Sequence, residues 1–270
     1  MATEILSGQV GEIRAASTAA GGTALSTTAT YIQLPTGSYH CYLTPRNFST
    51  AVVAKFSFNP YLVVLKTTDA MVTAPTDYSL YAQDADASTD VDVGSLSTLA
   101  NGDFLLVGSY LPFRGVYVDV DAANTQGTAT TSVYYAASGV WTDSSATDGT
   151  NSTMTFAVDG LVVWTVPSGW TPTTLKALYP HTPDSKYTNL NYYWTRWSVS
   201  AALADTTITF NSMVSANRST TYAELVSGQT FEERITTGVV GGVGCIEALT
   251  DAGTANLIAN VATVRDGKFS

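Results

Sequence analysis

The chain has 270 residues, and its 12 basic and 22 acidic side chains give a formal net charge of −10 at pH 7. Binding to phosphates requires clustered lysine and arginine, so this balance predicts neither a nucleic-acid partner nor attachment to an anionic membrane surface. Hydrophobic residues make up 45% of the chain, which is enough to bury a sizeable core. The longest apolar runs are far shorter than the ~20 residues of a membrane span, and the first residues show no secretory signal.

Cys41 and Cys245 are the two cysteines of the chain. Two cysteines are too few for a disulfide scaffold or a four-cysteine zinc site. Because cysteine is among the most buried residue types, two unpaired thiols in apolar surroundings are favoured, although a bridge between the ends of the chain stays open.

Residues 1–76 form the first of three zones. A stretch of small residues at 15–29 (AASTAAGGTALSTTA) offers little to bury and predicts an extended N-terminal arm or a loop. After this stretch, short runs of β-branched and aromatic residues between turn residues predict strands. The expected strands are Thr30–Leu34, Tyr39–Leu43, Val52–Phe58 and Leu62–Lys66.

Residues 77–214 contain all five tryptophans and are expected to form an antiparallel β-sandwich, because strand candidates recur there at the short spacing of such folds. The candidates are Tyr78–Ala82, Asp103–Gly108, Gly115–Val120, Ser132–Ala136, Thr153–Val158, Leu161–Trp164, Tyr192–Ala201 and Thr206–Phe210. Asp159-Gly160 predicts a two-residue hairpin turn, because this pair tolerates the positive φ angles of a type I′ turn.

The run from Tyr193 to Val199 predicts a strand with two different faces, because alternate side chains point to opposite sides. One face is expected to enter the core. Trp194 and Arg196 share the other face, which presents an aromatic ring and a cation to a partner or to a sheet surface. We predict an interaction surface from Trp194 and Arg196 together with Trp141 and Trp170; filling of the core and stacking on sugar rings stay open as alternatives.

Residues 215–270 form the last zone. A short helix is predicted at Thr220–Val226 with Ser219 as its cap, and strands are predicted at Cys245–Leu249 and Leu257–Arg265. The first and last zones have too little apolar content for separate domains, so we expect them to pack together, or against another subunit, as a small β-rich base. The predicted class is all-β: an antiparallel, jelly-roll-like β-sandwich with an extended N-terminal arm and this base.

Catalytic chemistry has little support in the sequence. His40 neighbours Cys41, but consecutive strand residues point to opposite faces, and His181 lies between prolines without a nearby nucleophile signature. The glycine-rich stretch Gly238–Gly244 lacks the lysine and the βαβ setting of a phosphate-binding loop. We predict no catalytic residues and no cofactor, and we expect that the chain is not an enzyme.

Acidic residues at even spacing, which share one face of an extended chain, occur in two groups: Asp84, Asp86, Asp90 and Asp92, and Asp119 and Asp121. Oxygen-rich loops bind Ca²⁺, but this spacing does not match the EF-hand loop. Solvated, solubilising loops are the favoured interpretation, and no metal site is predicted. A calcium site and a glycosidase-type carboxylate pair stay open as alternatives.

Spaced aromatics and Asp-Gly turns follow one another in four segments: Leu106–Val120 (LVGSYLPFRGVYVDV), Tyr134–Trp141 followed by Asp148-Gly149-Thr150, Gly160–Trp164 with Trp170, and Tyr193–Leu203 (YWTRWSVSAAL). In this order they resemble a module of structural proteins of tailed bacteriophages. The resemblance covers roughly half of the chain. It implies a β-sandwich module on a virion and does not distinguish between head, tail and fibre.

The resemblance implies localisation to the virion, after assembly in the host cytoplasm. The expected function is that of a capsid decoration or cement protein that binds the major capsid protein or other virion proteins. Virion geometry favours symmetric copies, so a homo-oligomer, first of all a trimer, is expected. The alternative is a tail or receptor-binding protein that recognises host surface glycans, and a polysaccharide-degrading hydrolase is the third hypothesis.

Overall fold

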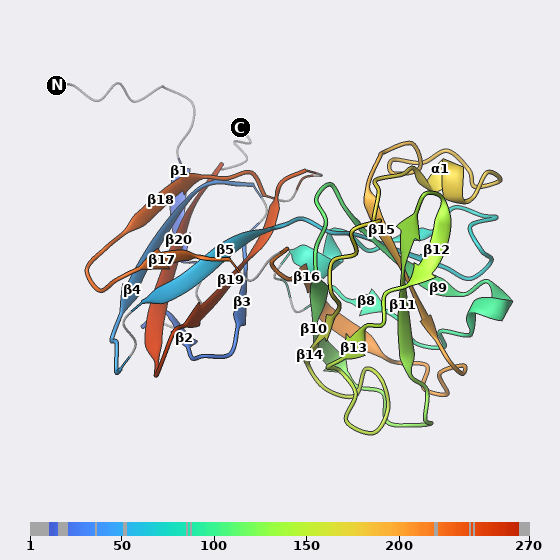
Figure 1. Ribbon diagram of the computed structural model, residues 1–270, viewed down its shortest axis with the longest axis horizontal. Coiled ribbons are helices and arrows are strands. Elements are labelled where there is room, and N and C mark those ends of the chain that lie inside the picture. Colours follow the sequence, from blue (N-terminus) through green and yellow to red (C-terminus); the bar gives the residue numbers. More distant parts are fainter. Residues whose placement is uncertain are drawn as a thin grey trace, which may run out of the picture. The chain divides into compact units, whose positions relative to one another are not determined.

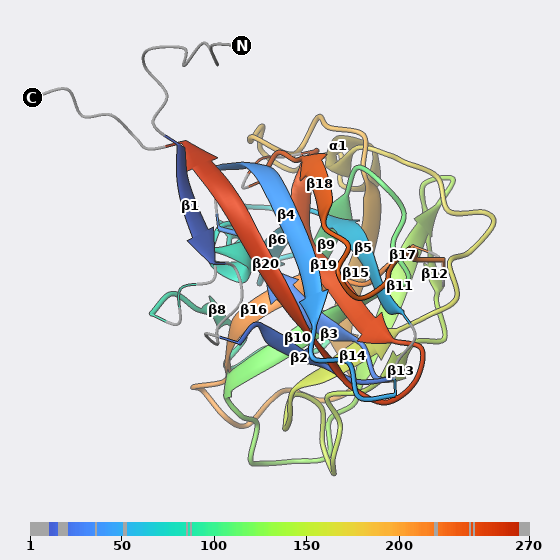
Figure 2. The ribbon, with the colours of Figure 1, turned by 90° about the vertical axis from the view of Figure 1, so that its left-hand side faces the viewer.

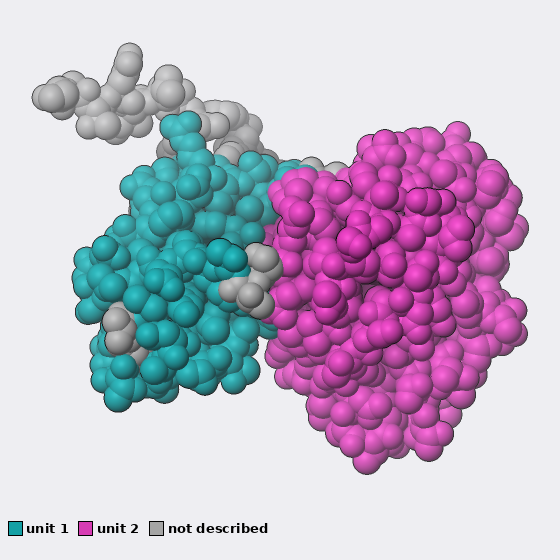
Figure 3. Space-filling view, in the orientation of Figure 1, with its two compact units in different colours: residues 1–58, 221–270 teal, residues 59–220 magenta. Residues whose placement is uncertain are grey.

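The computed structural model describes residues 11–15, 21–35, 37–50, 53–84, 86, 88–218, 221–237, 239 and 241–264. These residues are nearly all in antiparallel sheets and connecting loops, which confirms the predicted all-β, sandwich-like class (Figure 1). The chain forms two compact units, each with its own core (Figure 3). Unit 1 consists of residues 1–58 and 221–270, and unit 2 consists of residues 59–220.

Both ends of the chain contribute strands to unit 1. One sheet has the order β1-β20-β4-β18, with β2 also paired to β20, and Figure 2 shows these strands side by side. The second sheet has the order β17-β5-β19-β3. The bounds are β1 Gly11–Ala15, β2 Thr23–Leu25, β3 Thr30–Gln33, β4 Ser38–Arg46, β5 Ala54–Pro60, β17 Ala223–Leu225, β18 Phe231–Arg234, β19 Val243–Thr250 and β20 Ala255–Val264.

The core of unit 1 follows the two-residue period of its strands. Alternate residues of β20 from Ala255 to Val261 are buried, and Cys41 and Leu43 of β4 are buried in the same way. Residues of the second sheet, such as Phe56 of β5, belong to the same apolar cluster. Two sheets that bury their facing side chains together form a sandwich.

Unit 2 is built from a six-stranded and a five-stranded antiparallel sheet. The six-stranded sheet has the order β12-β11-β15-β9-β6-β7, with β6 Val63–Thr67, β7 Thr76–Asp77, β9 Phe104–Ser109, β11 Thr131–Ala137, β12 Val140–Asp143 and β15 Tyr193–Val199. The other has the order β13-β14-β10-β16-β8, with β8 Val91–Asp92, β10 Gly115–Ala122, β13 Thr147–Asp148, β14 Gly160–Val163 and β16 Thr209–Ser215. Short helices lie at η1 Tyr81–Gln83, η2 Leu99–Asn101 and α1 Leu175–Leu178.

The core of unit 2 is rich in aromatic rings. Trp197 of β15 and Phe210 of β16 are buried in it, and Trp164 packs edge-on against both Phe113 and Trp197. Such edge-to-face pairs contribute ~0.5–1.5 kcal/mol beyond the area that they bury.

Two predicted strands of unit 2 are wrong. The segment Tyr78–Ala82 contains a turn and the start of η1, because the Asp77 carboxylate accepts hydrogen bonds from the Ser79 amide and hydroxyl and turns the chain away from a sheet. The segment Thr153–Val158 folds back on Thr150 instead, whose hydroxyl accepts a hydrogen bond from the Phe156 amide.

The predicted Asp159-Gly160 hairpin turn is also wrong. Asp159 uses its side chain to accept a hydrogen bond from the Val120 amide, and Gly160 already belongs to β14. Gly160 lies so close to the Gly149 backbone that a Cβ atom would overlap it. A two-residue hairpin turn lies instead at Ser138-Gly139, where both φ angles are positive, between β11 and β12.

The predicted helix Thr220–Val226 is wrong where the structure describes it. Residues 223–225 form β17, which pairs with β5, because a helix of this length has too few internal hydrogen bonds to compete with a sheet edge. Its predicted cap, Ser219, lies outside the described residues, as does Thr220.

The terminal segments pair with each other within unit 1, as in β4 with β20. The division between the units lies after Phe58 and before Thr221, whereas the sequence predicted zones that change at residues 76 and 215. Within residues 15–29, which were predicted to form an N-terminal arm or a loop, residues 23–25 form β2, which pairs with β20, and residues 16–20 lie outside the described part. Before this stretch, β1 also pairs with β20, and residues 1–10 lie outside the described part.

Candidate interaction surface

The outer face of the six-stranded sheet of unit 2 carries two of the predicted interaction residues. Along β15, Trp197 and Val199 belong to the core, so Trp194 and Arg196 alternate onto the opposite face. The same alternation along β9 places Phe104, Leu106 and Gly108 on this outer face, next to β15.

Trp194 is fully buried on this face. Its indole Nε1 donates a hydrogen bond to the Thr173 carbonyl at 3.1 Å, and Tyr192 packs against its ring. The ring lies directly over Gly108, where a Cβ atom would overlap it. Trp194 therefore anchors the segment that covers the sheet and does not present a ring to a partner.

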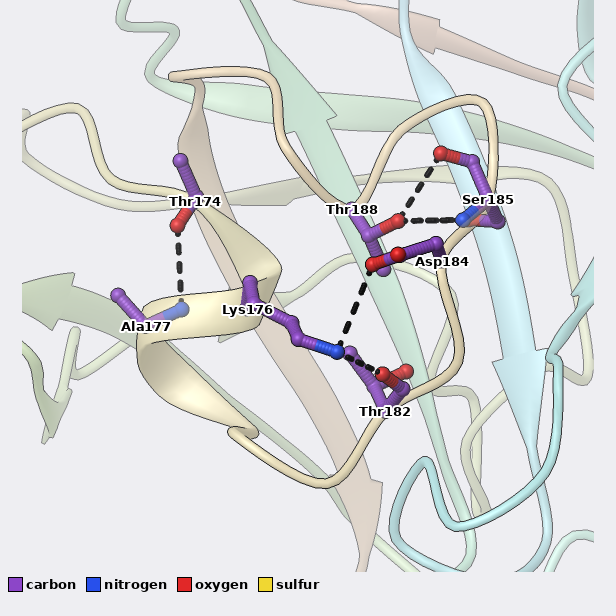
Figure 4. A network of polar contacts seen from close by, with 7 residues as sticks. All are labelled: Thr174, Lys176, Ala177, Thr182, Asp184, Ser185 and Thr188. Atoms are coloured by element: carbon purple, nitrogen blue, oxygen red, sulfur yellow. Dashed lines mark hydrogen bonds and ion pairs between the residues drawn. The ribbon is translucent and has the colours of Figure 1, made fainter.

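The covering segment, residues 171–192 with α1, is fixed by a polar network (Figure 4). The Thr174 hydroxyl caps α1 by accepting a hydrogen bond from the Ala177 amide. Lys176 Nζ donates to the Thr182 carbonyl at 2.6 Å and lies 3.5 Å from Asp184 Oδ1. The Thr188 hydroxyl accepts a hydrogen bond from the Ser185 amide at 2.6 Å.

Arg196 lies among aromatic rings. Its guanidinium carbon is 4.9 Å from the ring centre of Trp141, 5.1 Å from that of Tyr134 and 5.8 Å from that of Phe104. Tyr179, from the covering segment, packs against both Phe104 and Trp141. We call Arg196, Phe104, Tyr134, Trp141 and Tyr179 the Arg196 cluster.

The positions of these rings follow from the sheet register. Tyr134 of β11 lies directly opposite Arg196 of β15. Trp141 reaches the same face through the short β11–β12 hairpin, in which it lies opposite Ala136. Arg196, Tyr134 and Trp141 are half-buried, whereas Phe104 and Tyr179 are buried beneath them.

Burial raises the pKa of Tyr179, and the nearby charge of Arg196 acts in the opposite direction. The phenol is therefore protonated at neutral pH and carries no charge to neutralise the guanidinium. Each cation–π contact contributes about 0.5–2 kcal/mol, depending on how far the cation is desolvated. The Arg196 guanidinium is thus held by contacts with aromatic rings and not by an ion pair with Tyr179.

The structure brings together two of the four predicted interaction residues, Arg196 and Trp141. Trp170 lies on the core side, where its Nε1 donates to the Trp194 carbonyl at 3.2 Å and its ring packs against Phe113. Phe104, Tyr134 and Tyr179 were not among the predicted interaction residues. Strand alternation carries the signal for Phe104 and Tyr134, but no pattern relates Tyr179 to this face.

The two histidines lie apart. His40 Nε2 is 2.9 Å from Glu232 Oε1 in unit 1, whereas His181 Nε2 is hydrogen-bonded to the Ala70 carbonyl in unit 2. Of the glycine-rich stretch Gly238–Gly244, residues 238 and 240 lie outside the described part. Among the residues that the structure describes, no three His, Cys, Asp or Glu side chains gather as metal ligands.

Several of the evenly spaced aspartates accept hydrogen bonds, whereas Asp90 Oδ1 is buried without a partner. Asp84 accepts from the Asp86 amide and the Thr89 hydroxyl, and Asp92 accepts from the Gly94 amide. Asp121 accepts from the Thr209 hydroxyl. Short polar side chains that bond to nearby backbone in this way stabilise turns.

A polar hollow of about 360 Å³ lies in unit 2 at the end of β6. Four threonines, Tyr78, Lys66 and Asp92 are among its lining residues. Lys66 Nζ donates to the Asp92 and Gly94 backbone carbonyls at 3.1 and 3.2 Å, so the ammonium group is fixed by backbone acceptors. The Asp92 carboxylate accepts a hydrogen bond from the Gly94 amide.

No family model, curated protein or solved structure matches the chain. Within the described ranges, no helix combines the length and apolar character that crossing a membrane requires.

Proposed function

We propose that this chain is a structural protein of a bacteriophage virion, and most specifically a capsid decoration or cement protein that binds and stabilises the head shell. The observation that carries the proposal is the order of the four segments that resemble a phage structural module. All four lie in unit 2, on β9 and β10, β11 and β12, β14 and β15. The resemblance thus concerns one folded unit with its own core.

The second support is the use of polar groups in the described part of the chain. Carboxylates such as Asp84 and Asp148 accept hydrogen bonds within their own loops, and the two histidines belong to different units. A nucleophile, a base and an orienting acid must lie within hydrogen-bond reach for relay catalysis. A role in binding fits these side chains better than a role in turnover.

A cement protein contributes interfaces, and unit 1 offers a second, separate body for contact. We propose that the chain acts in the virion, as a homo-oligomer with a trimer as the first expectation, and that its partner is the major capsid protein or another virion protein. Symmetric shells favour repeated identical contacts.

The test is co-sedimentation of the full chain with capsids assembled from the coat protein of the same virus, followed by thermal melting of the complex. We expect saturable binding and a higher capsid melting temperature, because a ligand that binds only the assembled state stabilises it by mass action. Capsids that neither bind the chain nor gain stability contradict the proposal.

The polar hollow at Lys66 favours one second candidate, a tail or receptor-binding protein that recognises host glycans. Lys66, whose ammonium is fixed by backbone carbonyls, offers a donor to sugar hydroxyls, Asp92 in the same lining offers an acceptor, and Tyr78 offers a ring. Glycan-array binding that is lost in Asp92→Ala but kept in Asp184→Ala, an exposed aspartate of the covering segment, supports this candidate. An array without any binding counts against it.

A further inference from the structure

The Arg196 guanidinium lacks an anionic partner in the described part of the chain. No carboxylate oxygen of the described residues lies within 4.0 Å of its nitrogens, whereas His40, Lys55 and Lys176 each have an acidic neighbour at that range. This is notable because acidic residues outnumber basic ones by 22 to 12.

One polar atom of the Arg196 cluster is left without a hydrogen-bond partner. Arg196 Nε is buried and unpartnered, whereas the Tyr179 hydroxyl interacts with the side chains of Arg196 and Trp141. An unsatisfied buried donor carries a desolvation penalty of ~1–3 kcal/mol, more for a charged group. Native proteins satisfy such groups with water, an ion or a partner.

The rings prepare the guanidinium for one kind of ligand. The guanidinium carbon lies against the rings of Trp141 and Tyr134, and the N–H bonds of this planar group lie along its edge. Because Nε is buried and the side chain as a whole is half-buried, a ligand reaches the edge formed by the two terminal amino groups. That edge matches the two oxygens of a carboxylate. Because the rings already restrict the side chain, little conformational entropy is lost when a carboxylate binds.

The cluster is accessible and has the composition of a binding hot spot. Arg196, Tyr134 and Trp141 are half-buried, and β12 is an edge strand on which Val140, next to Trp141, is 65% exposed. Trp, Tyr and Arg are the residue types most enriched at hot spots of protein interfaces. A half-buried cation with apolar surroundings fits an acidic side chain on a partner protein.

We propose that the Arg196 cluster is a docking site for an aspartate or glutamate side chain of a partner protein. Arg196 binds the carboxylate through the two terminal amino groups of its guanidinium, and Trp141 and Tyr134 exclude water around the pair. The identity of the partner as a virion protein rests on the proposed function, whereas the carboxylate chemistry rests on the cluster alone.

The test uses two variants of the full chain, Arg196→Met and Arg196→Lys. Methionine keeps the apolar stem between the rings and removes the charge, and lysine keeps the charge and removes the planar edge. Lys186→Met is the matched control, because Lys186 is a cation of the covering segment that stacks on Tyr187 and lies outside the cluster. Melting temperature and tryptophan emission verify that each variant is folded.

In the first arm, arginine-labelled full chain is titrated with N-acetylglutamate amide and followed by the NMR signals of arginine side chains. We expect one Nε–H signal to shift to saturation in the wild type and in Lys186→Met, and to be absent in both Arg196 variants. The neutral probe N-acetylglutamine amide is expected to leave the signal in place. An Arg196 signal that glutamate does not move overturns the proposal.

In the second arm, capsid affinity is measured for the same proteins. We expect at least about a tenfold loss in Arg196→Met, a smaller loss in Arg196→Lys and none in Lys186→Met. Unchanged capsid affinity in a folded Arg196→Met overturns the docking site and leaves the proposed function standing. Wild type that ignores capsids but binds the glutamate probe contradicts the proposed function and supports the carboxylate site.

Two further results would overturn the choice of occupant. Self-association that is lost only in the Arg196 variants identifies the occupant as a second copy of this chain. Tighter binding of glucuronic acid than of the glutamate probe, again dependent on Arg196, identifies an acidic sugar. Sedimentation velocity and competition in the NMR titration distinguish these outcomes.

Discussion

Gly108 has a steric role that its backbone conformation does not reveal. It lies in β9 with an ordinary extended backbone, and the reason for a glycine is the Trp194 ring that rests against it. This contact joins the neighbouring strands β9 and β15, and it determines how close to the sheet the covering segment can lie. A tryptophan and a glycine on neighbouring strands thus act as one packing unit.

Gly108→Ala is expected to destabilise the protein by ~1–3 kcal/mol, the usual range for an overpacked core, because the added methyl group must displace the Trp194 ring. Urea unfolding followed by tryptophan emission measures the change. Gly169→Ala is the control, since nothing lies within 4 Å of its built Cβ, and it is expected to change stability by less than ~0.5 kcal/mol. Equal effects of the two substitutions would contradict the packing argument.

Cys41 is a second residue whose environment has a measurable consequence. Burial raises the pKa of its thiol from 9.0 to about 12. The folded chain therefore keeps this proton at pH values where the unfolded chain has lost it, so the free energy of unfolding falls as the pH rises from about 9 toward 12. Denaturant titrations at pH 8, 9, 10 and 11 are expected to show a shallower fall in Cys41→Ala than in the wild type. Parallel curves would show that this thiol makes no contribution.

At the scale of elements, the covering segment depends on few side chains. Lys176→Met removes the 2.6 Å bond to the Thr182 carbonyl and the ion pair, whereas Asp184→Asn removes only the ion pair. The ion pair is exposed, so it contributes little, while the bond to the carbonyl is worth ~1 kcal/mol. We expect amide exchange in the segment to become about fivefold faster in Lys176→Met and to stay unchanged in Asp184→Asn. The reverse order would show that the ion pair is dominant.

The elements that could be predicted are those with a regular period. The strand around Trp197 was predicted from alternation, which also separated the core face from the face of Trp194 and Arg196. The predicted Asp159-Gly160 hairpin was wrong because the same dipeptide can occur for reasons other than a turn. A glycine is needed at position 160 because the Gly149 backbone lies close to it, and the Asp159 carboxylate accepts a hydrogen bond from the Val120 amide of another strand. Burial of Trp194 by a loop with one short helix has no periodic signal, so the predicted surface included a residue that is covered.

At the scale of the whole molecule, the tryptophans and the cysteines lie in different units. All five tryptophans lie within residues 59–220, and both cysteines lie in the unit formed by residues 1–58 and 221–270. Tryptophan emission therefore reports on unit 2 and thiol reactivity on unit 1. Each unit has its own apolar core, which is the condition for independent folding.

The fragment 59–220, which contains unit 2 without unit 1, is expected to fold when produced alone. Its tryptophan emission and near-ultraviolet circular dichroism should match those of the full chain, and it should unfold in one cooperative step. A fragment with emission typical of exposed tryptophan and no transition would show that unit 2 requires the terminal strands.

The pairing of β1 with β20 sets Gly11 opposite Val264 in adjacent strands of one sheet. Opposed residues of an antiparallel pair are ~5 Å apart, a gap that a short linker spans. The polypeptide can thus be rejoined there and reopened at an exposed loop such as Ser138-Gly139, with every sheet retained. A circular permutant of this kind would carry a fused cargo at the β11–β12 hairpin, next to Trp141, so the pairing of β1 with β20 permits the molecule to be turned into a display scaffold.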